Sequence, residues 1–85
     1  MGMSWTVTVN ESAIDDLRWF GRKDGRVLLD EADRRLSAEP LAETRSMKTL
    51  RPNPVAQREL RLFGKYGGLF NADTESKGVT IVLVG

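Results

Sequence analysis

The chain has 85 residues, of which 40% are apolar and 29% are charged, and its formal net charge is +1. This balance is typical of one small globular domain and argues against disorder, and no apolar run reaches the roughly 18–20 residues of a membrane span. Because the sequence contains neither cysteine nor histidine, it excludes disulfides, thiolate nucleophiles, Ser–His catalysis and the usual Cys and His metal ligands.

These exclusions set the first expectations about organisation and location. We expect one domain over residues 1–85, a cytoplasmic location, no membrane association, no metal and no small-molecule cofactor. No secretory signal is recognisable at the N-terminus. Residues 1–3 are interpreted as a vector-derived or disordered start, since they precede the first patterned segment.

The N-terminal segment predicts a strand followed by a helix. Residues 5–9 alternate apolar and polar side chains, many of them β-branched, which is typical of a strand with one face on a core. Asn10 is a suitable N-cap for a helix over residues 11–20, and Gly21 is a natural C-terminal stop. Trp19 lies at the edge of the apolar stripe of this helix, and we expect it to pack against the next helix.

A second helix is expected after a short polar turn. Asp24 is the expected N-cap, and the helix ends before Pro40, because proline disfavours a helical conformation in the residue that precedes it. The apolar stripe consists of Leu28, Leu29, Ala32 and Leu36. The charged residues between them are spaced as i,i+4 pairs and are interpreted as a solvated face rather than a site. The two helices together predict an αα-hairpin.

The C-terminal half predicts a long loop and three strands. Residues 40–54 show no clear periodicity, and a loop of this length in a small domain is often functional. Alternating or β-branched segments predict strands over 57–62, 66–72 and 79–84. The last strand is almost entirely apolar, so we expect it to be buried on both faces. Because a buried strand usually leads to a further segment, we also expect that the natural chain either continues beyond Gly85 or is degenerate at this end. The resulting order is βααβββ, an α+β domain with both helices on one face.

Basic residues are concentrated in one segment. Residues 45–65 contain six basic side chains against the single carboxylate of Glu59, which gives this segment a net charge of +5. The six are Arg45, Lys48, Arg51, Arg58, Arg61 and Lys65. Such a concentration in a nearly neutral protein favours an anionic partner, and a solvated face is the alternative interpretation.

Residues 43–54 (ETRSMKTLRPNP), followed by the Arg-Glu-Leu-Arg of residues 58–61, resemble the RelE/ParE family of type II toxin–antitoxin toxins. The segment 66–71 and the final strand add to a resemblance that extends over residues 5–85. It implies a RelE-like fold, in which a twisted, mainly antiparallel four-stranded sheet carries the N-terminal pair of helices.

The same resemblance implies a function. It implies a toxin that cleaves mRNA on the ribosome and is neutralised by a cognate antitoxin, as in plasmid-stabilisation systems, so that the partners are the antitoxin, the ribosome and mRNA. Two alternatives remain open: a ParE-type inhibitor of DNA gyrase, and an inactive homologue that only binds antitoxin.

The candidate catalytic residues are Arg61, Arg58, Lys48 and Tyr66. Arginine and lysine supply charge-assisted hydrogen bonds to the phosphate during attack by a ribose 2′-hydroxyl. Tyr66 offers a ring for base stacking and a hydroxyl for proton relay, or else it packs in the core with its hydroxyl hydrogen-bonded. All six basic residues of the segment 45–65 are candidate RNA-binding residues.

Two features depart from the family that the sequence resembles. RelE toxins commonly carry an arginine directly after the tyrosine of this strand, whereas here that position is Gly67. They also commonly continue past the last strand with a basic segment. We therefore expect ribonuclease activity to be weakened or absent, because one preorganised charge donor typically contributes ~10²–10³ in rate.

Overall fold

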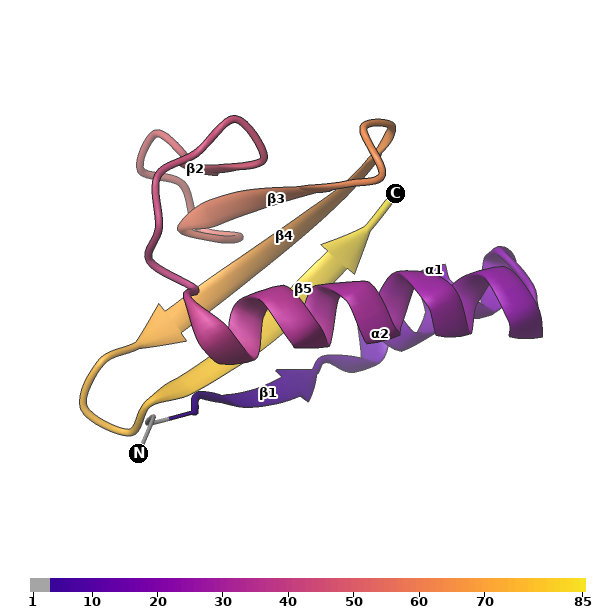
Figure 1. Ribbon diagram of the computed structural model, residues 1–85, viewed down its shortest axis with the longest axis horizontal. Coiled ribbons are helices and arrows are strands. Elements are labelled where there is room, and N and C mark those ends of the chain that lie inside the picture. Colours follow the sequence, from indigo (N-terminus) through magenta and orange to yellow (C-terminus); the bar gives the residue numbers. More distant parts are fainter. Residues whose placement is uncertain (1–3) are drawn as a thin grey trace.

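Five strands form one mixed sheet in the computed structural model, which describes residues 4–85 (Figure 1). The elements are β1 (Thr6–Val9), α1 (Glu11–Trp19), α2 (Arg22–Ala38), β2 (Met47–Thr49), β3 (Arg58–Leu62), β4 (Tyr66–Asp73) and β5 (Gly78–Val84). The strand order is β1-β5-β4-β3-β2, and only the β1–β5 pair is parallel. The expected α+β class and mainly antiparallel sheet are therefore confirmed, while the start expected at residues 1–3 lies outside the described residues.

The sheet has one strand more than the four expected. The additional strand, β2, spans three residues and pairs with β3, so that Lys48 lies opposite Glu59 and Thr49 opposite Arg58. Three residues are too few to display an alternating pattern, so this strand exists because β3 supplies hydrogen-bonding partners rather than because of its own sequence.

The two helices begin where local chemistry allows. Asn10 caps α1 as expected, since its Oδ1 accepts a hydrogen bond from the Ser12 backbone N–H at 3.2 Å. The second helix begins at Arg22 and not after Asp24, as the sequence had predicted. The correction has a physical reason: Gly21 adopts φ +92°, which favours glycine, and this turn lets α2 start at once.

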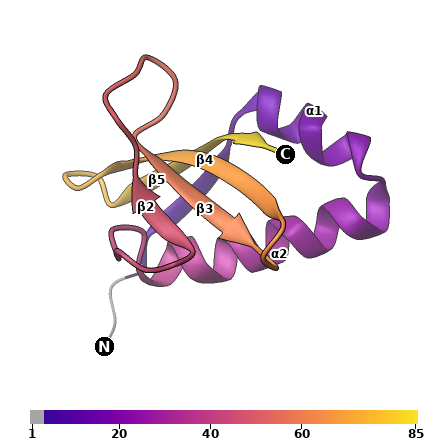
Figure 2. The ribbon, with the colours of Figure 1, turned by 90° about the horizontal axis from the view of Figure 1, so that it is seen from above.

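One apolar core lies between the helices and a single face of the sheet. Both helices, β2, β3, β4 and β5 contribute to it. Its buried members are Ala13, Leu17, Leu28, Ala32, Leu36, Met47, Leu60, Leu62, Phe70, Val79, Ile81 and Val84. In Figure 1 the long α2 passes in front of the strands, and Figure 2 shows the segment between β2 and β3 projecting away from the sheet.

The expectation that the last strand is buried on both faces is wrong. In β5, Val79 and Ile81 point into the core, but Thr80 is only half-buried and Leu83 is exposed. The helices cover one face, so the apolar residues of the other face serve strand formation rather than a second core. The opposite face of the sheet, which we call the open face, is therefore accessible across β2, β3, β4 and β5.

Trp19 also departs from its expected role. We expected the side chain to pack against the next helix, yet it is 84% exposed. Its main contact is with Phe20, whose ring centroid lies 5.3 Å away at an interplanar angle of 90°. The last residue of α1 therefore presents a large aromatic ring to solvent.

Candidate nucleic-acid interface

Two predicted cations lie together on the open face of the sheet. Side chains alternate between the faces of a strand, so Glu59 and Arg61 in β3 point away from the core that holds Leu60 and Leu62. Lys48 in β2 lies directly opposite Glu59, and its Nζ is 3.6 Å from Glu59 Oε1. The open face thus combines Lys48, Glu59 and Arg61 within two neighbouring strands.

Arg61 is the available cation of this group. Its side chain is exposed, and no ion pair involves it within residues 4–85. Its backbone is fixed, because its N–H donates to Ser46 O at 2.6 Å and its carbonyl accepts from Arg35 Nη1 at 3.0 Å. A fixed backbone with a free guanidinium suits a charge-assisted, bidentate contact with phosphate.

Arg58 faces the opposite side of the sheet and is only 8% exposed. Its Nη1 donates to Thr49 Oγ1 and its Nη2 to Ala42 O, both at 2.8 Å, and Nη2 lies 3.0 Å from Glu43 Oε2. The guanidinium therefore ties the segment before β2 to β3. This arrangement is internal, and it separates Arg58 from the cations on the open face.

Glu43 completes the cluster around Arg58. The Thr49 hydroxyl donates to Glu43 Oε2 at 2.7 Å. This hydrogen bond, together with the contact and charge of Arg58, holds the pKa of the Glu43 carboxyl below its ordinary value. Glu43 is therefore ionised at neutral pH and balances the charge of the buried arginine.

Tyr66 also lies on the helix side of the sheet. It stands opposite Leu62 in the β3–β4 ladder, and its ring meets Phe20 edge-on at a centroid distance of 5.3 Å. Lys65 Nζ lies 5.2 Å from the centre of the Tyr66 ring. The four candidate catalytic residues are thus divided: two lie on the open face, while Tyr66 and Arg58 lie on the other.

The remaining predicted RNA-binding residues are exposed. Arg45 and Arg51 lie on either side of β2, and Lys65 lies in the turn between β3 and β4. Asn53 orders the loop after Arg51, because its Oδ1 accepts from the Val55 and Ala56 N–H groups at 2.9 and 3.0 Å. The long segment before β3 is therefore held in a defined shape beside the open face.

Glu59 is a functional candidate that its sequence context does not reveal. It is the carboxylate between the two open-face cations, and it also approaches Gly67. A Cβ added at Gly67 would lie 3.7 Å from Glu59 Oε2, which is ordinary van der Waals contact. The alternation of β3 already placed Glu59 on the face of Arg61; the missing information was that β2 brings Lys48 opposite.

Other site types have little support within residues 4–85. No group of three or more acidic, histidine or cysteine residues is placed to hold a metal ion there. No helix of that part of the chain has the length and apolar character needed to cross a membrane.

Comparison with known structures defines the class of protein. The chain is similar to a chain of the RelBE2 toxin–antitoxin complex from Mycobacterium tuberculosis, with 28% identity and a TM-score of 0.82, covering 100% of this chain and 93% of that one. A chain of the archaeal RelE–RelB complex from Pyrococcus horikoshii gives 19% identity and a TM-score of 0.72, covering 96% and 93%. The isolated Escherichia coli RelE toxin gives 21% identity and a TM-score of 0.69, and the match covers 95% of this chain and 82% of that one.

The fold is therefore that of the toxins of RelE toxin–antitoxin systems. The resemblance read from the sequence is confirmed, because the solved structures to which the chain is similar are RelE toxins and their complexes with antitoxins. No protein-family model matches the sequence. No curated protein matches it either.

Proposed function

We propose that this toxin acts on mRNA at the ribosome, with weakened ribonuclease activity, and that a cognate antitoxin neutralises it. The observation that carries the proposal is the pair of open-face cations, Lys48 and Arg61, beside the ordered loop that contains Arg51. Such a surface attracts an RNA backbone, and its salt dependence follows from the release of counterions.

The chemistry proposed for the open face is attack of a ribose 2′-oxygen on the adjacent phosphorus. Arg61 and Lys48 stabilise the charge that develops on the phosphoryl oxygens. Glu59 accepts the proton of the 2′-hydroxyl, the O2′–P bond forms, and the P–O5′ bond breaks to give a cyclic phosphate and a 5′-hydroxyl protonated by water. Without histidine, most of the rate acceleration comes from orientation and charge stabilisation.

The weakened activity follows from Gly67. This residue lies opposite Arg61 in the β3–β4 ladder, and in the family that the chain resembles an arginine is common there. With glycine, the open face has one cation fewer around the reacting phosphate. Loss of one such donor costs ~10²–10³ in rate.

The antitoxin is proposed to bind the groove between the helices. A pocket of about 540 Å³ lies there, with Ile14, Leu17 and Leu29 among its apolar lining residues. Arg18, Arg22 and Arg26 also line this pocket. An amphipathic segment with acidic flanks matches an apolar groove bordered by arginines. Three neighbours were solved as complexes of RelE-type toxins with antitoxins, which supports this partner.

The test compares two target assays with one double variant. We expect slow, ribosome-dependent cleavage of mRNA by the parent chain, and loss of both cleavage and RNA binding in Lys48→Ala/Arg61→Ala. Inhibition of gyrase supercoiling without mRNA cleavage would favour the ParE-type alternative. Silence in both assays with tight antitoxin binding would identify an inactive homologue.

A further inference from the structure

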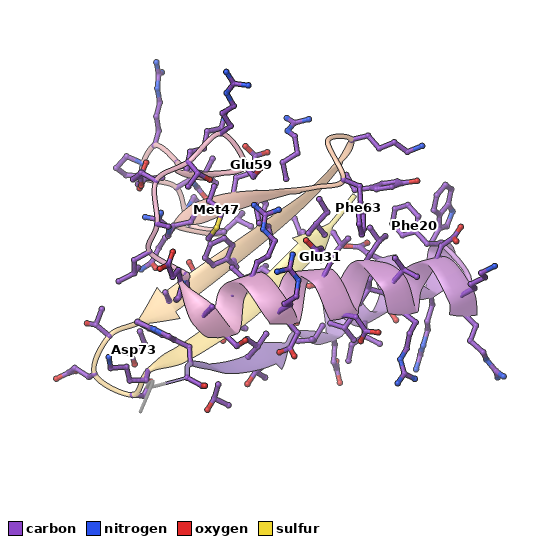
Figure 3. The ribbon with its side chains drawn as sticks, viewed as in Figure 1. Phe20, Glu31, Met47, Glu59, Phe63 and Asp73 are labelled. Atoms are coloured by element: carbon purple, nitrogen blue, oxygen red, sulfur yellow. The ribbon has the colours of Figure 1, made fainter. Side chains whose placement is uncertain are left out.

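A second pocket lies at the end of β5, on the side of the sheet where α1 ends. Its volume is about 290 Å³, just below the roughly 300–1,000 Å³ of typical ligand pockets, which suits one planar ring. It is lined by Asp16, Trp19, Phe20, Tyr66, Val84 and Gly85. Figure 3 labels Phe20 at this end of the molecule.

Three aromatic rings are in contact along this pocket. Phe20 meets Trp19 and Tyr66 edge-on, each at a centroid distance of 5.3 Å. Trp19 is 84% exposed, so a face of its indole is free to take another ring. A solvent-exposed ring that is held by its neighbours is a suitable stacking platform for a nucleobase.

Asp16 adds a polar contact to the same pocket. Its Oδ2 accepts a hydrogen bond from the Val84 N–H at 3.0 Å, which fixes the carboxylate beside the end of β5. Among residues 4–85, the hydrogen bond through Oδ2 is the one that its side chain makes, which leaves Oδ1 available. A carboxylate oxygen of this kind accepts from the exocyclic amino group of a base, as acidic side chains do from cytosine N4.

The pocket lies on the helix side of the sheet, and two glycines mark the end of the sheet between it and the open face. Gly67 and Gly85 exchange backbone hydrogen bonds of 2.6 and 2.7 Å, and Gly67 lies opposite Arg61. The two glycines carry no side chains, and Glu59 Oε2 would lie 3.7 Å from a Cβ added at Gly67 on the open face. Lys65, 5.2 Å from the Tyr66 ring, adds positive charge at the rim.

We propose that this pocket binds one base of a single-stranded RNA whose backbone runs from the open face over the end of β5. Trp19 stacks on the base, and Asp16 favours bases that carry an amino group over uracil. The proposal rests on the proposed function in assuming RNA on the open face, and it adds a residue outside the basic segment to the binding surface.

The experiment uses tryptophan fluorescence, because the chain has two tryptophans. In a Trp5→Phe variant, Trp19 becomes the only reporter, and oligoadenylate or oligocytidylate is expected to quench it. Trp19→Ala lowers the affinity for these oligonucleotides about 5- to 150-fold, as loss of one stacked base does. Trp19→Phe retains most of the affinity. Asp16→Asn reduces the ratio of the affinity for oligoadenylate or oligocytidylate to the affinity for oligouridylate. The matched control is Phe63→Ala, an exposed aromatic outside the pocket.

The outcomes separate this proposal from the proposed function. RNA binding that needs Arg61 but neither quenches nor depends on Trp19 would overturn the pocket and leave the function standing. Absence of RNA binding altogether would overturn both. A Trp19→Ala variant that loses antitoxin affinity while its RNA affinity is unchanged would assign the rings to a protein contact and refute the base-binding pocket.

Discussion

Arg58 and Arg61 lie in the same strand and have the same chemistry, yet the alternation of β3 sends them to opposite faces. Arg58 is surrounded by Thr49, Ala42 and Glu43, which use its donors to hold the preceding segment. Arg61 has its backbone fixed, and its guanidinium has no ion-pair partner among residues 4–85. At this scale, the charge of a residue says little about its role until its burial and partners are known.

Replacement of the buried arginine should therefore affect folding. Arg58→Ala loses the hydrogen bonds to Thr49 and Ala42 and the packing of its stem, and we expect the free energy of unfolding to fall by about 1–3 kcal/mol. Arg61→Ala, the matched exposed variant in the same strand, should change it by no more than about 0.5 kcal/mol. Urea denaturation measures both values, and equal losses would contradict the division of roles.

Glu43 should make stability depend on pH in the acid range. Its pKa is lowered in the folded state, first by the Thr49 hydroxyl and then by Arg58, from an ordinary value of 4.5. The unfolded chain binds the proton more readily, so this stabilisation is complete above about pH 4.5 and is lost as the pH falls through the folded pKa.

Unfolding free energies measured from neutral to acid pH test this linkage. Glu43→Gln should show a shallower decline than the parent chain across that window. The pKa of the Glu31 carboxyl is also lowered, by hydrogen bonding to Arg34. Because Glu31 is present in both proteins, it contributes equally to the slope of unfolding free energy against pH in each. Parallel curves for parent and variant would show that Glu43 is not involved.

At the scale of elements, the close approach of the two helices depends on Gly25. A Cβ placed there would lie 2.5 Å from the backbone oxygen of Leu17, well inside contact distance. The atom belongs to the main chain and cannot swing aside as a side chain would. The hairpin that brings Ala13 and Leu17 into the core therefore needs a residue without a side chain in the first turns of α2.

Gly25→Ala should destabilise the protein despite the better helix propensity of alanine. We expect a loss of about 1–3 kcal/mol, as for other overpacked sites. The control is Gly67→Ala, where the nearest atoms are 3.7 Å away and a strand residue with a side chain contributes about 0.5–1 kcal/mol of stability. Thermal or urea unfolding measures the change in stability of each variant. A loss for Gly25→Ala and a gain for Gly67→Ala would confirm that Gly25 is needed for the close approach of the helices. A Gly25→Ala variant as stable as the parent would refute it.

The long, strongly patterned elements could be predicted from the sequence, and the short or exposed ones could not. Periodicity located both helices and four of the five strands to within a few residues, because apolar side chains repeat wherever an element faces the core. It missed β2, whose existence depends on a partner distant in the sequence. The sequence pattern also predicted packing of Trp19 against the next helix, because large aromatic side chains are usually buried, whereas the side chain is exposed.

The candidate site was predictable only as a set of charges. Six basic residues in one segment were visible from the sequence, but which of them share a face depends on the β2–β3 pairing. That pairing puts Lys48 beside Glu59 and turns Arg58 inward. The role of Glu59 depends on the same tertiary information, since a lone carboxylate among cations is ordinarily a charge-balancing residue.

At the scale of the whole molecule, the two faces of the sheet have different tasks. One face and the helices hold the core, and the proposed antitoxin groove lies on the helices. The other face carries Lys48, Glu59 and Arg61, and the aromatic pocket lies on the helix side at the end of β5. The proposed recognition surface is thereby separated from the core, and we expect that an open-face residue can change without loss of the fold.

This separation allows activity to be tested with folding unchanged. We expect expression of the chain in growing cells to cause little growth arrest, because the open face lacks a cation at Gly67. Gly67→Arg has room for its Cβ and should increase cleavage of translated mRNA. The increase in cleavage rate should stay below the ~10²–10³ that one charge donor typically contributes. Glu59 lies close enough to pair with the new guanidinium, and the effects of catalytic groups that act as a unit do not simply multiply.

Gly67→Ala is the matched control for backbone and packing effects, and it should leave cleavage at the parent level. Adding Arg61→Ala to Gly67→Arg should abolish the gain in cleavage, since the two cations are proposed to flank the same phosphate. Rapid growth arrest with mRNA cleavage by the unmodified chain would contradict the prediction, because it would mean that Lys48 and Arg61 suffice for full activity without a third cation on the open face.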